Sequence, residues 1–202
     1  MGRYKIIIVG GFHEVIELCE RCLLEIVGII DNRLHGKFRG YTILGSDEDA
    51  FVLYEKYGDC KLVLTPDSPQ IREKLYYYYS QIGFQFATII SPNARISNSA
   101  YIGEGTIVQD GVNVSSDTQI GKCCKLNTNS NIMHDNQISD FVTIAPNAVS
   151  LGYIKIGMRS YIGANSTLLP YVNISSDVIV GAGAVVTKNV TNNVIVKGVP
   201  AK

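Results

Sequence analysis

The stretch Ile162-Gly163-Ala164-Asn165-Ser166-Thr167-Leu168 contains the pattern that decides the fold. An aliphatic residue returns at every sixth position, and a small or β-branched residue usually stands two positions before it. The spacing runs from residue 96 to residue 186 with one break, at Ser150. Its aliphatic positions are Ile96, Ile102, Val108, Val114, Ile120, Leu126, Ile132, Ile138, Ile144, Ile156, Ile162, Leu168, Ile174, Val180 and Val186. A period of six fits neither an amphipathic helix nor an alternating strand, and it is typical of a parallel β-helix. We expect one short strand and one turn per hexad, three hexads per triangular coil, and aliphatic side chains along the axis.

The residues before the repeat alternate between strand and helix patterns. Strands are expected at Lys5–Val9, Val27–Ile30, Lys61–Leu64 and Phe84–Ala87. Helices are expected at Glu14–Leu24, from a cap at Asp47 to about Tyr57, and from Ser68-Pro69 through Tyr79. The intervening segment around Lys37–Gly40 is interpreted as a polar loop. This order predicts a small Rossmann-like parallel sheet, with one α/β domain at 1–88 and the β-helix domain at 89–202.

The composition bears on the partners and on the compartment. Lysine plus arginine equals aspartate plus glutamate, at 18 each, so net charge favours neither nucleic acid nor an anionic membrane as a partner. The apolar runs are too short to span a bilayer. Met1-Gly2-Arg3-Tyr4 leads into a strand-like run, which predicts that no signal peptide is present. Five cysteines without disulfide-like spacing predict a reduced, cytoplasmic protein, with Cys19 and Cys22 as core thiols.

The turn after the first strand is a candidate nucleotide site. Gly10-Gly11 stands between a strand and a helix, where backbone N–H groups can hold phosphate. Asp31 ends the second strand, where a ribose-binding acid is expected. A tight structural turn explains the two glycines equally well. The dinucleotide pattern G-x-G-x-x-G is absent, which argues against a nicotinamide enzyme.

His134 is the candidate for catalysis. The chain has three histidines, of which only His134 lies in the repeat, so a three-histidine metal site on the β-helix is not expected. His134 follows the inward Ile132 at a turn and precedes Asp135. One coil of eighteen residues would place Gly152 beside it, about 4.8 Å away by strand spacing. A base, a carboxylate and a glycine with a free N–H fit acyl transfer.

The hexads Ile102–Ile107 and Ile162–Thr167 resemble those of the hexapeptide-repeat acyltransferases, whose β-helix is left-handed. The run Leu126-Asn127-Thr128-Asn129-Ser130-Asn131-Ile132-Met133-His134-Asp135 is similar to the catalytic stretch of the sialic-acid O-acetyltransferase and bacillosamine-type N-acetyltransferase branch. The resemblance implies a homotrimer with acetyl-CoA in the groove between adjacent helices. Two departures stand out: Phe12 replaces a small residue before His13, and Thr143 replaces a second histidine of the family.

The resemblance also implies a role for each site residue. His134 would be the general base, Asp135 its orienting carboxylate, Gly152 the oxyanion donor and Asn127 a sugar contact. Gly163 and Ala164, one coil further on, would line the pantetheine groove together with Gly152. The nucleotide-sugar would be held by Gly10, Gly11, His13, Asp31 and Asn32. No metal is implied.

Together with these residues, the resemblance implies direct transfer of an acetyl group from acetyl-CoA to the amine of a nucleotide-linked 4-amino-4,6-dideoxy sugar. O-acetylation of a sialic acid or another sugar hydroxyl could use the same residues. A non-catalytic scaffold or nucleotide sensor built on the β-helix is the alternative from a different class, and the His134, Asp135 and Gly152 set argues against it. The sequence does not distinguish UDP, dTDP or GDP as the nucleotide.

Overall fold

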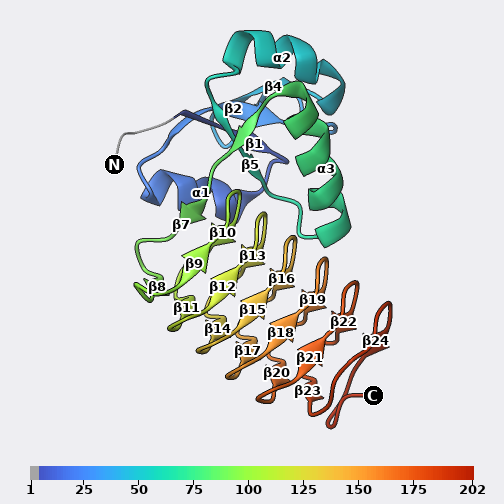
Figure 1. Cartoon of the computed structure of the whole chain (residues 1–202). Coiled ribbons are helices and arrows are strands. Elements are labelled where there is room, and N and C mark those ends of the chain that lie inside the picture. The colour runs from blue at the N-terminus through green and yellow to red at the C-terminus, as the bar shows by residue number, and fades with distance from the viewer. Residues whose placement is uncertain (1–4) are drawn as a thin grey trace.

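A computed structural model describes residues 5–202 as an α/β region followed by a column of short parallel strands (Figure 1). The prediction for Met1–Tyr4 lies outside the described residues. The α/β region contains β1 (Lys5–Val9), α1 (His13–Arg21), β2 (Glu25–Ile30), β3 (Lys37–Phe38), β4 (Tyr41–Gly45), a 3-10 turn (Asp47–Asp49), α2 (Ala50–Tyr57), β5 (Lys61–Leu64), α3 (Pro69–Ile82) and β6 (Gln85–Phe86). Its strand order is β3-β4-β2-β1-β5-β6. The predicted α/β fold with a mainly parallel sheet is confirmed.

A hairpin lies where the sequence predicted a polar loop. Lys37–Phe38 pairs antiparallel with Tyr41–Thr42, and the turn residues Arg39 and Gly40 have φ of 49° and 87°. Two consecutive residues with positive φ are typical of the tight turns that connect hairpin strands. β4 also pairs in parallel with β2, so the hairpin extends the sheet at one edge.

Several helix ends differ from the predicted boundaries, including that of α3, which continues past Tyr79 to Ile82. α1 ends at Arg21 instead of Leu24, because Leu23 adopts a left-handed φ of 56°. Asp47 does not cap α2 as predicted; it begins the preceding 3-10 turn, where the Asp49 carboxylate accepts a hydrogen bond from Ser46 N–H at 2.8 Å. The predicted start of α3 is confirmed: Pro69 is its first residue and Ser68 Oγ accepts from the N–H of Ile71.

The repeat forms a left-handed parallel β-helix, as predicted. Its strands are β7 (Ile89–Ile90), β8 (Arg95–Ile96), β9 (Tyr101–Ile102), β10 (Ile107–Val108), β11 (Asn113–Val114), β12 (Gln119–Ile120), β13 (Lys125–Leu126), β14 (Asn131–Ile132), β15 (Gln137–Ile138), β16 (Thr143–Ile144), β17 (Val149–Ser150), β18 (Lys155–Ile156), β19 (Tyr161–Ile162), β20 (Thr167–Leu168), β21 (Asn173–Ile174), β22 (Ile179–Val180), β23 (Val185–Val186) and β24 (Ile195–Val196). The hexad aliphatics and the small residues two positions before them fill the core of the column.

The strands form three sheets, which we name by chain order. Sheet I contains β7, β10, β13, β16, β19, β22 and β24; sheet II contains β8, β11, β14, β17, β20 and β23; sheet III contains β9, β12, β15, β18 and β21. The chain turns from sheet I to II at the first corner, from II to III at the second, and from III to I at the third. Asn131 pairs with Val149, so each residue lies beside the residue eighteen positions later.

Arg72 of α3 joins the α/β region to the β-helix. Its side chain is 1% exposed. Its Nε donates to Cys123 O at 3.0 Å and its Nη2 donates to Phe141 O at 2.9 Å, both at the third corner. Its Nη1 donates to the carbonyl oxygens of Pro66 and Asp67 at 2.9 Å. Burial lowers the pKa of Arg72, although the neighbouring Cys124 and Asp67 act in the opposite direction.

Of the four consecutive tyrosines of α3, Tyr76 and Tyr77 contact the β-helix, whereas Tyr78 and Tyr79 donate to Asp47 within the α/β region. Tyr76 and Tyr79 face inward, where Tyr76 donates to Glu104 Oε1 at 2.7 Å and Tyr79 donates to Asp47 Oδ1 at 2.6 Å. Tyr77 and Tyr78 are more exposed, at 47% and 36%. The run therefore serves packing and hydrogen bonding along α3.

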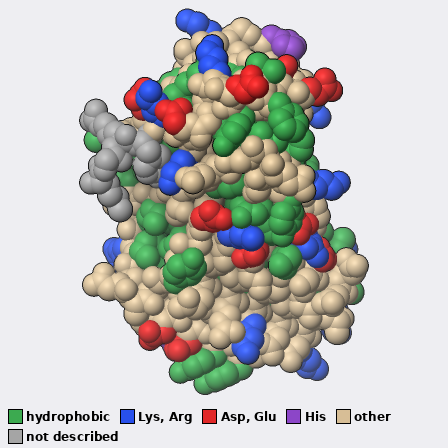
Figure 2. All heavy atoms as spheres, turned by 45° about the horizontal axis from the view of Figure 1, so that its top comes forward, with side chains coloured by type: hydrophobic (Ala, Val, Ile, Leu, Met, Phe, Trp, Pro, Cys, Tyr) green, Lys and Arg blue, Asp and Glu red, His purple; other side chains and the backbone are tan. Residues whose placement is uncertain are grey.

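Cys19 and Cys124 pack as predicted, whereas Cys22 is only partly buried and its thiol donates to Ile90 O at 3.4 Å. Cys19 is buried, and burial, followed by the neighbouring Cys22, raises the pKa of its thiol to about 12. Cys124 lies in the core of the column, where its thiol donates to Ser139 O at 3.2 Å. No helix within residues 5–202 has the length and apolarity to cross a membrane. On the face shown in Figure 2, basic and acidic side chains are intermixed and form no patch of one sign.

We expect Arg72→Met to lower the free energy of unfolding by about 3 kcal/mol, because buried carbonyl groups at the third corner lose their donor. Urea denaturation followed by circular dichroism measures this change. Arg95→Met, at an exposed position of sheet II, is the control and is expected to match the wild type. Equal stability of both variants would show that the Arg72 contacts make no net contribution to the free energy of unfolding.

Candidate active site

His134 and Asp135 lie at the second corner, in the turn between β14 and β15. Their side chains are 46% and 36% exposed, and His134 Nδ1 lies 2.8 Å from Asp135 Oδ2. An ionised carboxylate can only accept, so Nδ1 carries the proton of this hydrogen bond. The neutral imidazole then presents Nε2 as its acceptor, which is the state that a general base requires.

Gly152 lies against the imidazole, as the eighteen-residue coil predicts. A Cβ atom at Gly152 would lie 2.7 Å from His134 Cε1 and 2.9 Å from its Nε2, so any larger residue would displace the ring. Within residues 5–202 the Gly152 N–H donates no hydrogen bond. The arrangement therefore combines a base, its carboxylate and a free backbone donor in two adjacent coils.

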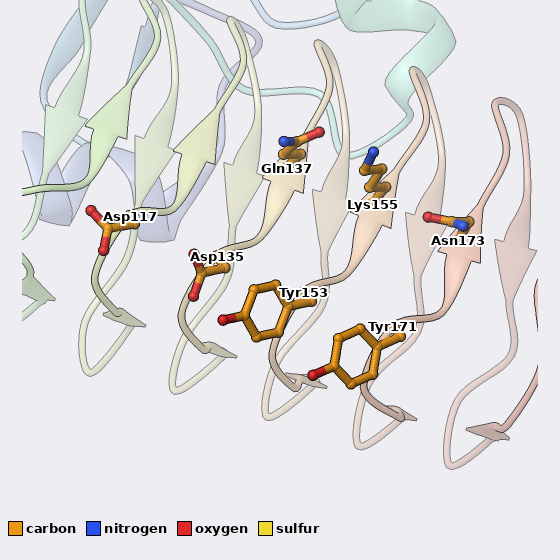
Figure 3. Close-up of a pocket in the computed structure, with 7 residues that line it drawn as sticks. All are labelled: Asp117, Asp135, Gln137, Tyr153, Lys155, Tyr171 and Asn173. Carbon is orange, nitrogen blue, oxygen red and sulfur yellow. The ribbon is translucent and has the colours of Figure 1, made fainter.

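A polar groove of about 380 Å³ lies beside this corner (Figure 3). Asp117, Asp135, Tyr153 and Tyr171 follow one another at eighteen-residue spacing along one wall, and Gln137, Lys155 and Asn173 line the other. The Tyr153 ring meets the His134 ring edge-on at 5.4 Å and stacks on Tyr171 at 5.1 Å. The charge of Asp135, with smaller contributions from burial and Tyr171, raises the pKa of Tyr153. The tyrosines were not predicted, although their spacing from Asp135 was visible in the sequence.

Asn127, Gly163 and Ala164 lie at the first corner, away from His134 in the same chain. The pairing of β13 with β16 and of β16 with β19 places Gly163 two coils beyond Asn127. The residue one coil beyond Gly152 is Pro170, so the prediction that Gly163 and Ala164 lie one coil beyond Gly152 was wrong. Asn127 is 6% exposed, and its Nδ2 donates to Ile144 O at 3.1 Å. Only a second copy of the chain could bring the two corners together.

The α/β region has a cavity of about 290 Å³ at the carboxyl ends of β1 and β2. Three of the predicted nucleotide-site residues, Gly10, Asp31 and Asn32, line it together with Val9, Ile30, Arg33, Asp47, Pro66, Ile71 and Leu75. Gly10 has a φ of 88°, and a Cβ there would lie 2.6 Å from Thr65 Oγ1. Glycine is therefore required at this turn for both conformation and space.

Asp31 organises the mouth of this cavity. Its Oδ2 accepts from Gly11 N–H at 2.8 Å, and its Oδ1 accepts from Arg33 N–H at 2.8 Å and Leu34 N–H at 3.0 Å. Burial raises the pKa of this carboxyl, but the three backbone donors together outweigh that effect and lower it. The Asp31 carboxylate thus holds the Gly11 turn against the following loop.

Asn32 and His13 make contacts that were not predicted. Asn32 Nδ2 donates to Asp47 Oδ2 at 2.7 Å, and Asp47 N–H donates to Asn32 Oδ1 at 2.8 Å. His13 does not line the cavity: its ring lies 4.6 Å from that of Phe38 and its Nδ1 lies 3.3 Å from Arg39 Nη1. Residues 5–202 contain no group of three histidine, cysteine, aspartate or glutamate side chains that could hold a metal ion.

The whole architecture recurs in solved structures. WeeI from Acinetobacter baumannii is 31% identical, with a TM-score of 0.89 over 98% of this chain and 99% of that chain. PerB from Caulobacter crescentus, solved with CoA and GDP-perosamine, is 30% identical, with a TM-score of 0.93 over 98% and 96%. The acetyltransferase domain of PglB from Neisseria gonorrhoeae, solved with acetyl-CoA, is 27% identical, with a TM-score of 0.92 over 100% and 99%.

This chain belongs to the hexapeptide-repeat sugar N-acetyltransferases. The alignments extend over nearly the full length of both chains, so the similarity includes the α/β region as well as the β-helix. The predicted family and enzyme class, an acyltransferase, are confirmed. No protein-family model matches this sequence, and no similar curated protein was found.

Asp31→Asn is expected to destabilise the protein near neutral pH and to have little effect in acid. The native pKa of Asp31 lies below its unfolded value, so its contribution is present above an unfolded pKa of about 4 and is lost as pH falls through the native pKa. Thermal melts across this range measure the difference from the wild type. Glu48→Gln, at an exposed carboxylate, is the control. A difference that stays constant with pH would contradict the assigned role of the charge.

Proposed function

We propose that this enzyme transfers an acetyl group from acetyl-CoA to the amine of a nucleotide-linked 4-amino-4,6-dideoxy sugar. The observation that carries the proposal is the contact between His134, Asp135 and Gly152. PerB, solved with CoA and GDP-perosamine, supports a nucleotide-linked amino sugar as the acceptor. Two further structures are variants of perosamine N-acetyltransferase in which a histidine is replaced by asparagine or by alanine.

In the proposed reaction the amine nitrogen attacks the acetyl carbonyl carbon. The new C–N bond forms first and gives a tetrahedral oxyanion, His134 Nε2 accepts the proton that the nitrogen loses, and the C–S bond then breaks. Asp135 holds the ring and stabilises the charged imidazolium. The Gly152 N–H donates to the developing oxyanion. The imidazolium can then return its proton to the departing thiolate. No covalent bond to the enzyme is required, because holding amine and thioester together supplies much of the rate advantage.

The second corner fits a thioester co-substrate. At Gly152 the missing side chain leaves the backbone open beside the imidazole, where a Cβ would displace the ring. PglB and PerB were solved with acetyl-CoA and CoA, respectively. We place the reacting carbonyl next to Gly152 and the pantetheine along the groove between neighbouring subunits, lined by Gly163 and Ala164 of the adjacent copy.

We assign the nucleotide to the cavity of the α/β region, between the Gly10-Gly11 turn and the Asp31-Asn32 loop. The turn precedes α1, whose first N–H groups favour a phosphate. Phe12 stands where the family has a smaller residue, and the Lys125 ammonium lies 4.7 Å from the centre of its ring. His13 would reach a ligand only at the outer edge of this turn.

The acceptor site requires two copies of the chain. The α/β region contacts sheet I and the third corner through Arg72 and Lys125, whereas His134 lies at the second corner, across the column from sheet I. The nucleotide cavity and the base of one chain therefore face different sides. We propose a homotrimer, in which each site combines the base of one subunit with the cavity and Asn127 of its neighbour.

An acceptor panel tests the reaction. Thiol release from acetyl-CoA is measured with UDP-, dTDP- and GDP-linked 4-amino sugars and with free sialic acid. We expect rapid release with one nucleotide-linked amino sugar. Release with sialic acid alone would replace the proposal by O-acetylation, and the absence of both release and CoA binding would favour a scaffold.

The same assay tests the base. His134→Ala is expected to lower turnover by about 10²- to 10⁴-fold, the usual contribution of a general base, while the fold and CoA affinity stay unchanged. Arg95→Ala, at an exposed position of sheet II two coils before the strand that leads to His134, is the control and keeps wild-type turnover. An active His134→Ala enzyme would remove this residue from the mechanism.

Mixed trimers test whether sites are shared. His134→Ala removes the base, and Ile71→Trp fills the nucleotide cavity, because Ile71 lines that cavity. Each variant alone is expected to be inactive. Coexpression with two different tags, followed by isolation of mixed trimers, should restore activity at interfaces that pair an intact base with an intact cavity. Mixed trimers without activity would show that each site lies within one chain.

A further inference from the structure

Two buried residues under the second corner break the hexad pattern. Asn136 occupies a position that is small or apolar elsewhere, and Ser150 replaces an aliphatic residue. The two are 0% and 1% exposed. The next coil has Ile154 and Leu168 at the corresponding positions, so the column accepts apolar side chains there. The amide and the hydroxyl are therefore not required to fill the core.

The two side chains form one hydrogen-bonded unit. Ser150 Oγ donates to Asn136 Oδ1 at 2.8 Å. Asn136 Nδ2 donates to Met133 O at 2.7 Å and to Leu151 O at 2.8 Å, with a longer contact of 3.3 Å to His134 O. These acceptors are the backbone on either side of the base and the residue directly before Gly152. One amide thus ties together the two coils that carry the site.

Other inward polar residues make only some of the hydrogen bonds that Asn136 makes. Thr106 and Ser160 each donate to the carbonyl fifteen residues ahead, at Gly121 and Ser175. Asn136 makes the same link to Leu151 and adds the bonds within its own turn. A serine at position 136 could keep the link to Leu151 but would lack the second donor and the acceptor that Ser150 satisfies. The asparagine is therefore specific to the turn that carries His134.

We propose that Asn136 and Ser150 are positioning residues that fix His134 relative to Gly152. Buried polar groups cost stability unless they are fully paired, and this pair is retained beneath the one turn whose geometry the reaction needs. Neither side chain is exposed, so neither contacts substrate. The expected effect on kcat rests on the proposed acetyl transfer. The expected effect on the position of His134 relative to Gly152 does not.

The kinetic consequence is confined to turnover. A shift of about 1 Å between base and oxyanion donor can lower a rate by roughly 10²-fold. Binding of the acceptor in the α/β cavity does not involve this corner. We therefore expect loss of the pair to lower kcat and leave KM for the acceptor unchanged.

The decisive variant is the double substitution Asn136→Ser with Ser150→Val. It restores the regular hexad, keeps the total side-chain volume similar and leaves no unpaired amide. We expect its melting temperature to equal or exceed that of the wild type, while kcat falls about 10- to 100-fold, as for a misplaced base. Ser150→Thr keeps the hydroxyl and is expected to retain wild-type kcat. Ser160→Ala removes a buried layer-to-layer hydroxyl at another corner and is the control.

A second readout does not depend on activity. The imidazole NMR signals of the three histidines can be assigned by single replacements, and the His134 signal is expected to shift and broaden in the double variant but not in Ser160→Ala. Wild-type kcat together with an unchanged His134 signal would overturn the positioning role. If the wild type transfers no acetyl group, the proposed function fails, and the NMR comparison still decides the positioning role.

Discussion

The eighteen-residue register of the β-helix is the constraint on which the other features depend. Parallel pairing satisfies the backbone only between adjacent coils, so each side chain meets the side chain eighteen residues away and few others. The register places Gly152 against His134 and aligns Tyr153 with Asp135 along the groove. A ligand site on such a column must be assembled from stacked residues at a corner, because the interior is filled by the hexad aliphatics and the small residues between them.

The attachment of the α/β region is the second constraint. Arg72 inserts into the third corner, and Lys125 of sheet I lies 3.3 Å from Asp67 and 3.2 Å from the carbonyl oxygen of Thr65. Thr143, which stands where the family has a second histidine, accepts from Arg72 and donates to Asp67 O. This position is therefore part of the interface and is unavailable to a ligand. The interface commits the α/β region to the side of the column opposite His134, which is why we expect subunits to share sites.

The column also shows how a regular repeat accommodates a specific geometry. Its hexads are closed mainly by aliphatic and small residues, and the inward polar residues of other coils are serines and threonines such as Thr106 and Ser160. Polar replacement beneath the His134 turn costs hydration energy that the hydrogen bonds of Asn136 and Ser150 offset. The same hydrogen bonds orient the carbonyl groups of two neighbouring turns. Apolar packing alone cannot orient them, because the hydrophobic effect is not directional.

The sequence by itself determined the β-helix, the parallel α/β sheet, the start of α3 at Ser68-Pro69 and the contact between His134 and Gly152. Those features follow from periodicity and chain connectivity, which are written along the chain. Only the tertiary structure showed that Arg72 inserts into the third corner, and that Asp31 uses its carboxylate to hold its own loop. These contacts depend on which way each corner faces and on how two regions pack. Both are set by side chains far apart in sequence, so no local pattern contains them.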